Sequence, residues 1–144
     1  MEVMPVLRVK HFLQQCRSEQ RELKILMEKR EQLRSSLLPA AVQPKDVNVQ
    51  TSGSGDKMSE VMAEAIDFDK KIEGKLQEMI KRQARAMDII SKVQKSQHRQ
   101  VLILYYLGQS PRTWQEVADE MQYSVDYIYD LHGQALVEAE QYFK

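Results

Sequence analysis

The feature that most constrains the fold is a pair of helix-start signals, Thr113 and Ser124, in the last third of the chain. Glu116 follows Thr113 at the spacing of a capping box, in which the hydroxyl and the carboxylate each accept a backbone N–H at the start of a helix. Ser124 is a second N-cap candidate. The spacing predicts a short helix after Thr113, a brief turn, and a longer helix after Ser124 that runs to about Tyr142.

Apolar residues at helical spacing give both predicted helices a face that packs inward. Those residues are Val117, Ala118 and Met121 in the first helix and Ile128, Leu131 and Ala135 in the second. The small side chain of Ala118 lets the two helices cross closely. Such a pair forms a helix-turn-helix, whose second helix normally enters the major groove of DNA. A further helix over 96–107, ended by Gly108, is predicted to pack against the pair.

Two stretches of this region carry a family signal: VLILYYLGQSPRTWQEVADEMQYS from Val101 and YIYDLHGQAL from Tyr127. The residues that carry the family signal are Trp114 directly after the cap, the sequence E-V-A at 116–118, the pair Y-S at 123–124 and the sequence L-H-G-x-A-L at 131–136. At these residues the chain resembles the C-terminal module of the RinA/ArpU-type regulators of phages and mobile elements in Gram-positive bacteria. That module is itself similar to region 4 of sigma factors. A looser resemblance covers SGSGDKMSEVMAEAIDFDKKI from residue 52.

The resemblance implies transcription control in a phage or mobile element, often the activation of late genes. It places the second helix of the motif on promoter DNA. The turn of this chain carries Gln122 where the family usually has glycine. If the turn needs a left-handed backbone, a side chain at that position costs on the order of 1 kcal/mol.

The first two thirds of the chain predict two long helices. The run from Val6 to Leu38 contains neither glycine nor proline and has a heptad-like apolar seam, interrupted at Glu19 and Arg30. The seam residues are Val9, Phe12, Cys16, Leu23, Leu26, Leu33 and Leu37. Residues 57–95 repeat an apolar position every seven residues, and Asp69 interrupts the neighbouring seam. The repeating residues are Met58, Ala65, Ile72, Met79, Ala86 and Val93.

The sequence therefore predicts an all-α protein, a long coiled-coil-like helical hairpin followed by a small helix-turn-helix head. Residues 1–38 hold the N-terminal long helix, 39–56 a flexible linker rich in Pro, Gly and Ser, 57–95 the second long helix, and 96–144 the head. The apolar stripe of the second helix is wide enough for more than one partner helix. We therefore expect a second copy of the chain to complete it, giving a homodimer.

Composition and motifs argue against several classes of function. The single cysteine, Cys16, excludes an internal disulfide and is interpreted as a small apolar residue. The N-terminus lacks the apolar core of a signal peptide, and no apolar stretch is long enough to span a membrane, so we expect a cytoplasmic protein. Three isolated histidines predict no metal site. Without nucleophile or dinucleotide motifs, we expect neither an enzyme nor a cofactor or small-molecule ligand.

Charge is distributed unevenly along the chain. Residues 1–94 hold 17 Lys and Arg against 14 Asp and Glu, whereas residues 95–144 hold 4 against 7. Between Arg112 and Lys144 there is no lysine or arginine, although most affinity for duplex DNA comes from neutralising phosphates. The positive charge would have to come from Lys92, Lys95, Arg99 and Arg112. His132 is interpreted as a polar flank of the last helix, with a base or phosphate contact as the alternative.

The candidate DNA-binding residues combine the outward face of the last helix with its cap and two arginines. They are Arg99, Arg112, Ser124, Asp126, Tyr127, Tyr129, Asp130, His132, Gly133 and Gln134. Two hypotheses follow. The first is a transcription regulator that acts on promoter double-stranded DNA, on RNA polymerase, or on both. The alternative is a protein-interaction module with a degenerate helix-turn-helix, which binds a host protein through its acidic, tyrosine-rich face.

Overall fold

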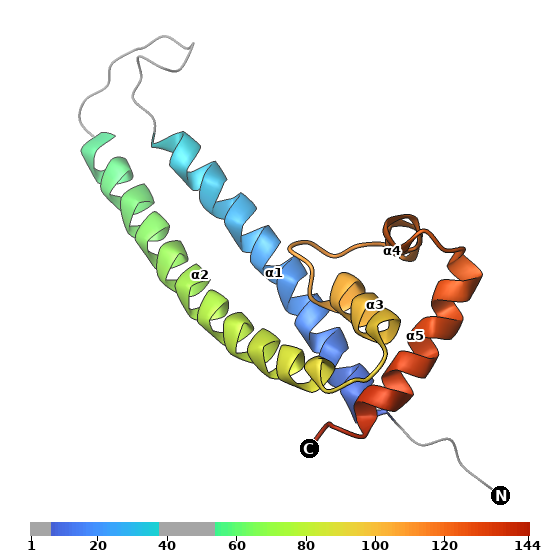
Figure 1. The fold of residues 1–144 in the computed structure, drawn as a ribbon. Helices are drawn as coiled ribbons and strands as arrows, with labels where there is room; N and C mark the ends of the chain where they lie inside the picture. Colours follow the sequence, from blue (N-terminus) through green and yellow to red (C-terminus); the bar gives the residue numbers. More distant parts are fainter. Residues whose placement is uncertain (1–6, 38–53) are drawn as a thin grey trace, which may run out of the picture. The chain divides into compact units, whose positions relative to one another are not determined.

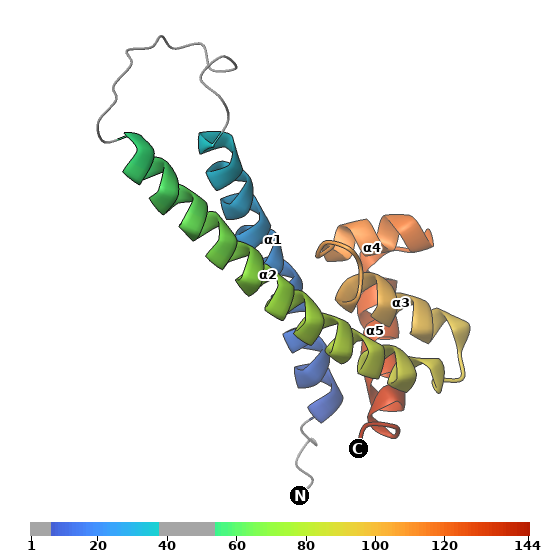
Figure 2. The same ribbon diagram turned by 90° about the vertical axis from the view of Figure 1, so that its left-hand side faces the viewer.

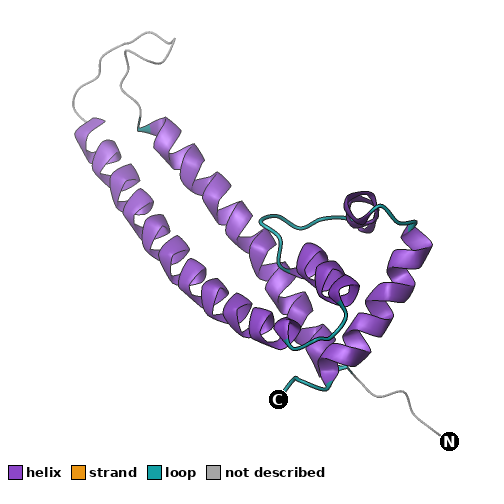
Figure 3. Cartoon of the chain, viewed as in Figure 1, coloured by secondary structure: helices purple, strands orange, loops and turns teal. Residues whose placement is uncertain are grey.

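The computed structural model describes residues 7–37 and 54–144, and all regular structure in those ranges is helical (Figures 1 and 3). The helices are α1 (Arg8–Ser36), α2 (Ser54–Ser91), α3 (Ser96–Tyr106), α4 (Trp114–Met121) and α5 (Val125–Glu140). The predicted all-α class, with long helices followed by smaller ones, is confirmed. Of the helices in the described ranges, none combines the length and the apolar character that a membrane span requires.

The chain divides into two compact units. One, here called the head unit, contains the chain up to Glu22 and from Glu78 to Lys144; the other, the hairpin unit, is Leu23–Gln77. The predicted head began at residue 96, whereas the head unit also includes the first part of α1 and the last part of α2. The reason is that apolar residues of these two segments are buried in the same core as those of α3, α4 and α5.

The core of the head unit draws on all five helices. Its fully buried members are Val9, Leu13, Cys16, Ala86, Ile90, Val101, Leu102, Val117, Ala118, Ile128, Ala135 and Ala139. With Leu131 only 3% exposed, the predicted inward faces of α4 and α5 are confirmed except at Met121, which is half-buried. Cys16 is confirmed as a small buried residue, and burial raises the pKa of its thiol to about 11. Figure 2 shows α3, α4 and α5 gathered together within this unit.

Polar contacts attach α1 to the rest of the head unit. The carboxylate of Glu140 accepts the backbone N–H of Val9 at 2.8 Å, and this satisfies a donor that the first turn of a helix leaves free. Gln20 Nε2 donates to the carbonyl oxygen of Tyr106 at 2.8 Å. Glu19, one of the predicted seam interruptions, is buried and forms an ion pair with Arg82 of α2. This polar break in the seam therefore has a partner.

Local capping explains where α4 and α5 begin. The backbone N–H of Glu116 donates to Thr113 Oγ1 at 3.1 Å, and the N–H of Thr113 donates to Glu116 Oε1 at 2.8 Å, so the capping box is confirmed. The N–H of Tyr127 donates to Ser124 Oγ at 3.1 Å. Gln122 has φ 62° and ψ 43°, the left-handed conformation in which a glycine is favoured. The left-handed backbone on which the expected cost depends is therefore present at this residue.

The hairpin unit holds the second part of α1 and the first part of α2, which run in opposite directions (Figure 1). Arg30 and Asp69, which interrupt the two predicted seams, form an ion pair at 3.8 Å. Ile72 is buried, but Leu23, Leu26 and other seam residues of α1 are only half-buried. Large apolar side chains also remain exposed: Ile25, Met27, Met58, Met62, Ile66 and Leu76.

The second long helix differs from its prediction at both ends. It begins at Ser54 rather than residue 57, and it ends at Ser91 rather than residue 95. It ends there because the N–H groups of Lys92 and Val93 bond to carbonyls three residues back, which tightens the last turn and stops the helix. The rest of the predicted linker, residues 39–53, lies outside the described residues.

Candidate functional site

The exposed face of α5 carries most of the candidate residues. Asp126, Tyr127, Tyr129, Asp130, Gly133 and Gln134 are all exposed. Tyr127 and Tyr129 are 42% and 49% exposed, so their rings are available for contact with a partner. Ser124 is different, because its hydroxyl accepts the backbone N–H of Tyr127 as the helix cap. Nothing lies within 4 Å of a Cβ added at Gly133, so no contact within the described residues requires a glycine there.

His132 is not a polar flank of α5, and that interpretation is wrong. Its ring is half-buried, lies 4.5 Å from the Trp114 ring between centroids, and contacts Tyr105 and Tyr106 as well. Nε2 lies 2.6 Å from the hydroxyl oxygen of Tyr106. Burial, and to a smaller degree the charge of Lys10, lowers the pKa of His132 to about 4. A neutral, enclosed imidazole of this kind holds α5 against α3 and α4.

The two candidate arginines are engaged with other parts of the chain. Arg99 Nη1 donates to the carbonyls of Val93 at 2.7 Å and Gln94 at 3.0 Å, which fixes the connection between α2 and α3. Arg112 Nη1 donates to the carbonyl of Leu104 at 3.3 Å, and its Nε lies 3.1 Å from Glu120. These bonds direct both guanidinium groups toward carbonyls and a carboxylate of the chain itself.

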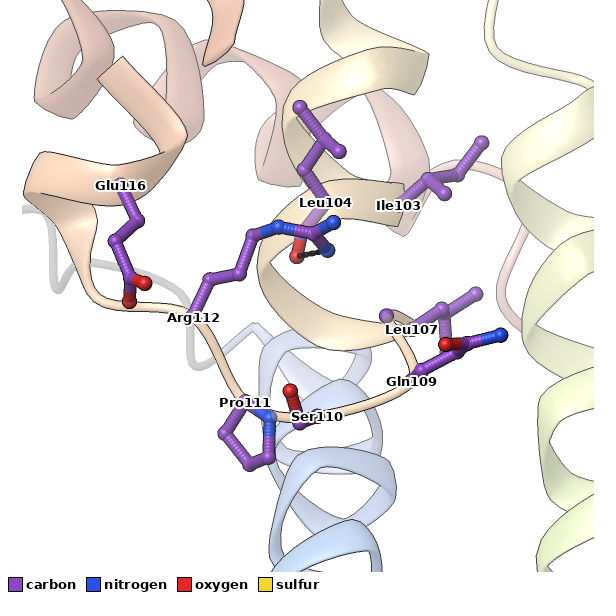
Figure 4. A pocket seen from close by; sticks show the side chains of 9 residues that line it. Ile103, Leu104, Leu107, Gln109, Ser110, Pro111, Arg112 and Glu116 are labelled. Carbon is purple, nitrogen blue, oxygen red and sulfur yellow. Dashed lines mark hydrogen bonds between the residues drawn. The ribbon is translucent and has the colours of Figure 1, made fainter. Parts of the chain in front are cut away.

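Arg112 also lines a groove of about 450 Å³ between α3 and the connection to α4 (Figure 4). Ile103 and Leu107 form its apolar side, while Ser110 and Glu116 contribute polar atoms. A Cβ added at Gly108 would collide with the guanidinium of Arg112. A side chain at residue 108 would therefore require the guanidinium of Arg112 to shift. Gly108 does not provide a left-handed helix end, because its φ is not positive.

The sequence did not indicate that α1 takes part in this region. Arg17 Nη1 donates to the carbonyl of Tyr105 at 2.8 Å, and its guanidinium carbon lies 3.9 Å from the centroid of the Tyr105 ring. Trp114 stacks on the same ring, with centroids 3.6 Å apart and planes 8° from parallel. The two groups must therefore occupy opposite faces of Tyr105. Trp114 in turn meets the edge of Tyr129, an exposed candidate residue of α5.

Within residues 7–37 and 54–144, the His, Cys, Asp and Glu side chains form no cluster of three or more that suits a metal ion. His98 instead pairs with Glu138, whose carboxylate lies 2.7 Å from Nδ1. The second oxygen of Glu138 accepts the backbone N–H of Gln94 at 2.8 Å. These bonds lower the pKa of Glu138 and connect α5 to the segment between α2 and α3.

A family model described as DUF1492, a protein of unknown function, matches residues 40–140. The chain belongs to this DUF1492 family. No match was found among curated proteins or among solved structures. The region matched to DUF1492 contains α2, α3, α4 and α5 and every candidate residue on them, whereas α1 lies outside it. Arg17 therefore lies outside the matched region.

Proposed function

We propose that the chain is a transcription regulator of a phage or mobile element, similar to the RinA/ArpU-type regulators, and that α5 binds promoter DNA. The observation that carries the proposal is the arrangement of α4 and α5. A capping box starts α4, the left-handed Gln122 ends it, and Ser124 caps α5, which are the parts of a helix-turn-helix. The second helix of this pair presents an exposed polar face, which is where such motifs contact base edges.

The chemistry of that face suits selection of sequence more than strength of binding. The carboxylates of Asp126 and Asp130 can accept hydrogen bonds from cytosine N4, and Gln134 can bond to adenine. Tyr127 and Tyr129 can contact phosphates or stack against sugars. Aspartate, glutamine and tyrosine do not supply the positive charge that neutralises phosphates. The attraction for DNA must therefore come from other parts of the molecule or from RNA polymerase.

A second candidate function is supported by the same surface. Exposed tyrosines beside two carboxylates are typical of protein-interaction sites, where aromatic residues provide contact area and acids select a basic partner. Tyr123 and Tyr127 lie 4.7 Å apart between ring centroids and extend the aromatic surface toward the turn. On this hypothesis the helix-turn-helix framework is kept and the partner is a basic host protein instead of DNA.

Binding to duplex DNA separates the two functions. The full chain would be titrated against a pool of random-sequence duplexes over a range of salt concentrations, and bound duplexes would be recovered and sequenced. A regulator should enrich a sequence, and its binding constant should fall steeply as salt rises. Tyr127→Phe together with Gln134→Ala should change the enriched sequence but not the salt dependence, because neither change removes a charge. Failure to bind any duplex at about 50 mM salt favours the protein-interaction function.

A further inference from the structure

One face of α1 in the head unit carries a row of donor groups. Successive steps of three or four residues connect Lys10, Gln14, Arg17 and Arg21, and Ser18 lies four residues after Gln14, so all five fall on the same side of the helix. All are exposed except the half-buried Arg17. The acid of this stretch, Glu19, points elsewhere, since it is buried and paired with Arg82. This row, the α1 ridge, is therefore a strip of positive charge.

The α1 ridge lies beside the helix-turn-helix. Arg17 stacks on Tyr105, and Trp114 at the start of α4 stacks on the opposite face of that ring. At the other end of the ridge, Lys10 is near enough to His132 of α5 for its charge to lower the pKa of that imidazole. The ridge thus borders both helices of the motif, and it brings cations to a region where α4 and α5 contain no lysine or arginine.

A hollow of about 240 Å³ opens on this ridge, lined by Gln14, Arg17, Ser18, Arg21 and Tyr105. Two guanidinium groups, an amide and a hydroxyl offer the donors that a phosphate oxygen accepts. Arg17 and Arg21 crowd one another: burial lowers the pKa of Arg17, and the charge of Arg21 lowers it further. Glu116 is the nearby acid on α4, but its carboxylate is already bonded to Thr113. An anion would relieve this crowding.

We propose that the α1 ridge binds backbone phosphates of the DNA duplex on which α5 lies, so that α1 supplies affinity while α5 selects sequence. This inference rests on the proposed function. It assigns to Lys10, Arg17 and Arg21 the role that sequence alone gave to Lys92, Lys95, Arg99 and Arg112. The ridge lies outside the region matched to DUF1492. Phosphate contacts carry no base information, so the ridge strengthens binding to every sequence alike.

The test compares the salt dependence of DNA binding in matched variants. Lys10→Gln with Arg21→Gln removes two exposed cations that make no hydrogen bond or ion pair with any residue the structure describes. The double variant should weaken binding to specific and random duplexes by the same factor. The slope of log K against log salt should fall by about 2, since each lost phosphate contact removes about 0.9.

Lys29→Gln with Arg34→Gln is the control, because it removes the same charge from exposed positions of the hairpin unit. The slope of log K against log salt for this control variant should match the slope for the unaltered chain. An unchanged slope in the ridge variant, with the unaltered chain binding DNA, would overturn the role of the ridge and leave the proposed function in place. An equal loss in both pairs would overturn it too, by showing a general effect of charge. Failure of the unaltered chain to bind DNA would instead contradict the proposed function itself.

Discussion

The hydroxyl oxygen of Tyr106 lies 2.6 Å from Nε2 of His132 and joins the end of α3 to the middle of α5. Burial raises the pKa of the tyrosine and lowers that of the histidine to about 4, so both groups are neutral near neutral pH. A neutral imidazole nitrogen accepts the hydroxyl proton, whereas an imidazolium has no lone pair to offer. The contact that holds these helices together is therefore sensitive to acid.

We expect the head unit to lose stability as the pH falls from about 6.5 to about 4. In that window the unfolded chain binds a proton at His132 and the folded chain does not, so each pH unit removes up to about 1.4 kcal/mol. Denaturant unfolding followed at several pH values measures the slope. In His132→Gln the slope over this window should be smaller. A slope equal to that of the unaltered chain would show that His132 titrates normally in the folded state.

Replacing Gln122 with glycine should stabilise the head unit by about 1 kcal/mol. The residue has φ 62°, and glycine adopts this conformation without the strain that a Cβ causes. The matched control is Gln134→Gly, at an exposed position inside α5, which should destabilise by about 1 kcal/mol. Thermal unfolding of both variants checks the opposite signs. Destabilisation by Gln122→Gly would mean that the glutamine side chain contributes more than the strain it causes.

Leu131→Ala should destabilise the head unit by about 2–5 kcal/mol, because this side chain is 3% exposed and its removal leaves a cavity between α5 and the core. Val137→Ala on the same helix is the control, since Val137 is 59% exposed and should matter little. Near-ultraviolet circular dichroism follows the aromatic packing of the head unit. If the two variants unfold at the same temperature, Leu131 does not point into the core.

We expect the chain to form a homodimer through α2. Met58, Met62, Ile66, Ile80 and Met87 are all more than 40% exposed and fall on one side of this helix. Sedimentation equilibrium at micromolar concentration should give about twice the 16.8 kDa of one chain. Ile66→Gln with Ile80→Gln should restore a monomer, and Val137→Gln on α5 should not. A monomer in the unaltered chain would rule out this interface.

Changing Asp126 and Asp130 together to asparagine distinguishes the two candidate functions by sign. Both are exposed on α5. If this face meets DNA, each carboxylate repels phosphates, so the variant should bind duplexes more tightly and discriminate less at cytosines. If the face binds a basic protein, the same change should weaken that complex. If the affinity for DNA and the affinity for the partner protein both stay constant, the exposed face of α5 is not the functional surface.

The parts of this protein that the sequence predicted are those governed by local rules. Thr113, Glu116 and Ser124 bond to backbone groups within three residues, so the starts of α4 and α5 follow from neighbouring letters. The inward positions of α5 follow from helical periodicity in the same way. The sequence leaves the backbone conformation of Gln122 conditional on the turn, and the backbone angles show it to be left-handed.

The parts that escaped prediction depend on residues distant in the sequence. Arg17 is 88 residues from Tyr105, and no periodicity in either helix indicates that they meet. His132 seemed a polar surface group because its neighbours on α5 are polar, but the rings that enclose it come from α3 and α4. The bonds of Arg99 and Arg112 are not predictable from the sequence, because their carbonyl partners carry no sequence signature.

The stack on Tyr105 also gives the molecule an internal optical reporter. Trp114 is the single tryptophan of the chain, and its ring lies parallel to that of Tyr105 with Arg17 on the far side. Its emission therefore reports on a contact that joins residues of α1, α3 and α4. Any ligand that displaces Arg17, or any solvent condition that separates these helices, should change the tryptophan emission spectrum, so no added label is needed. Events confined to Leu23–Gln77 should leave this spectrum unchanged.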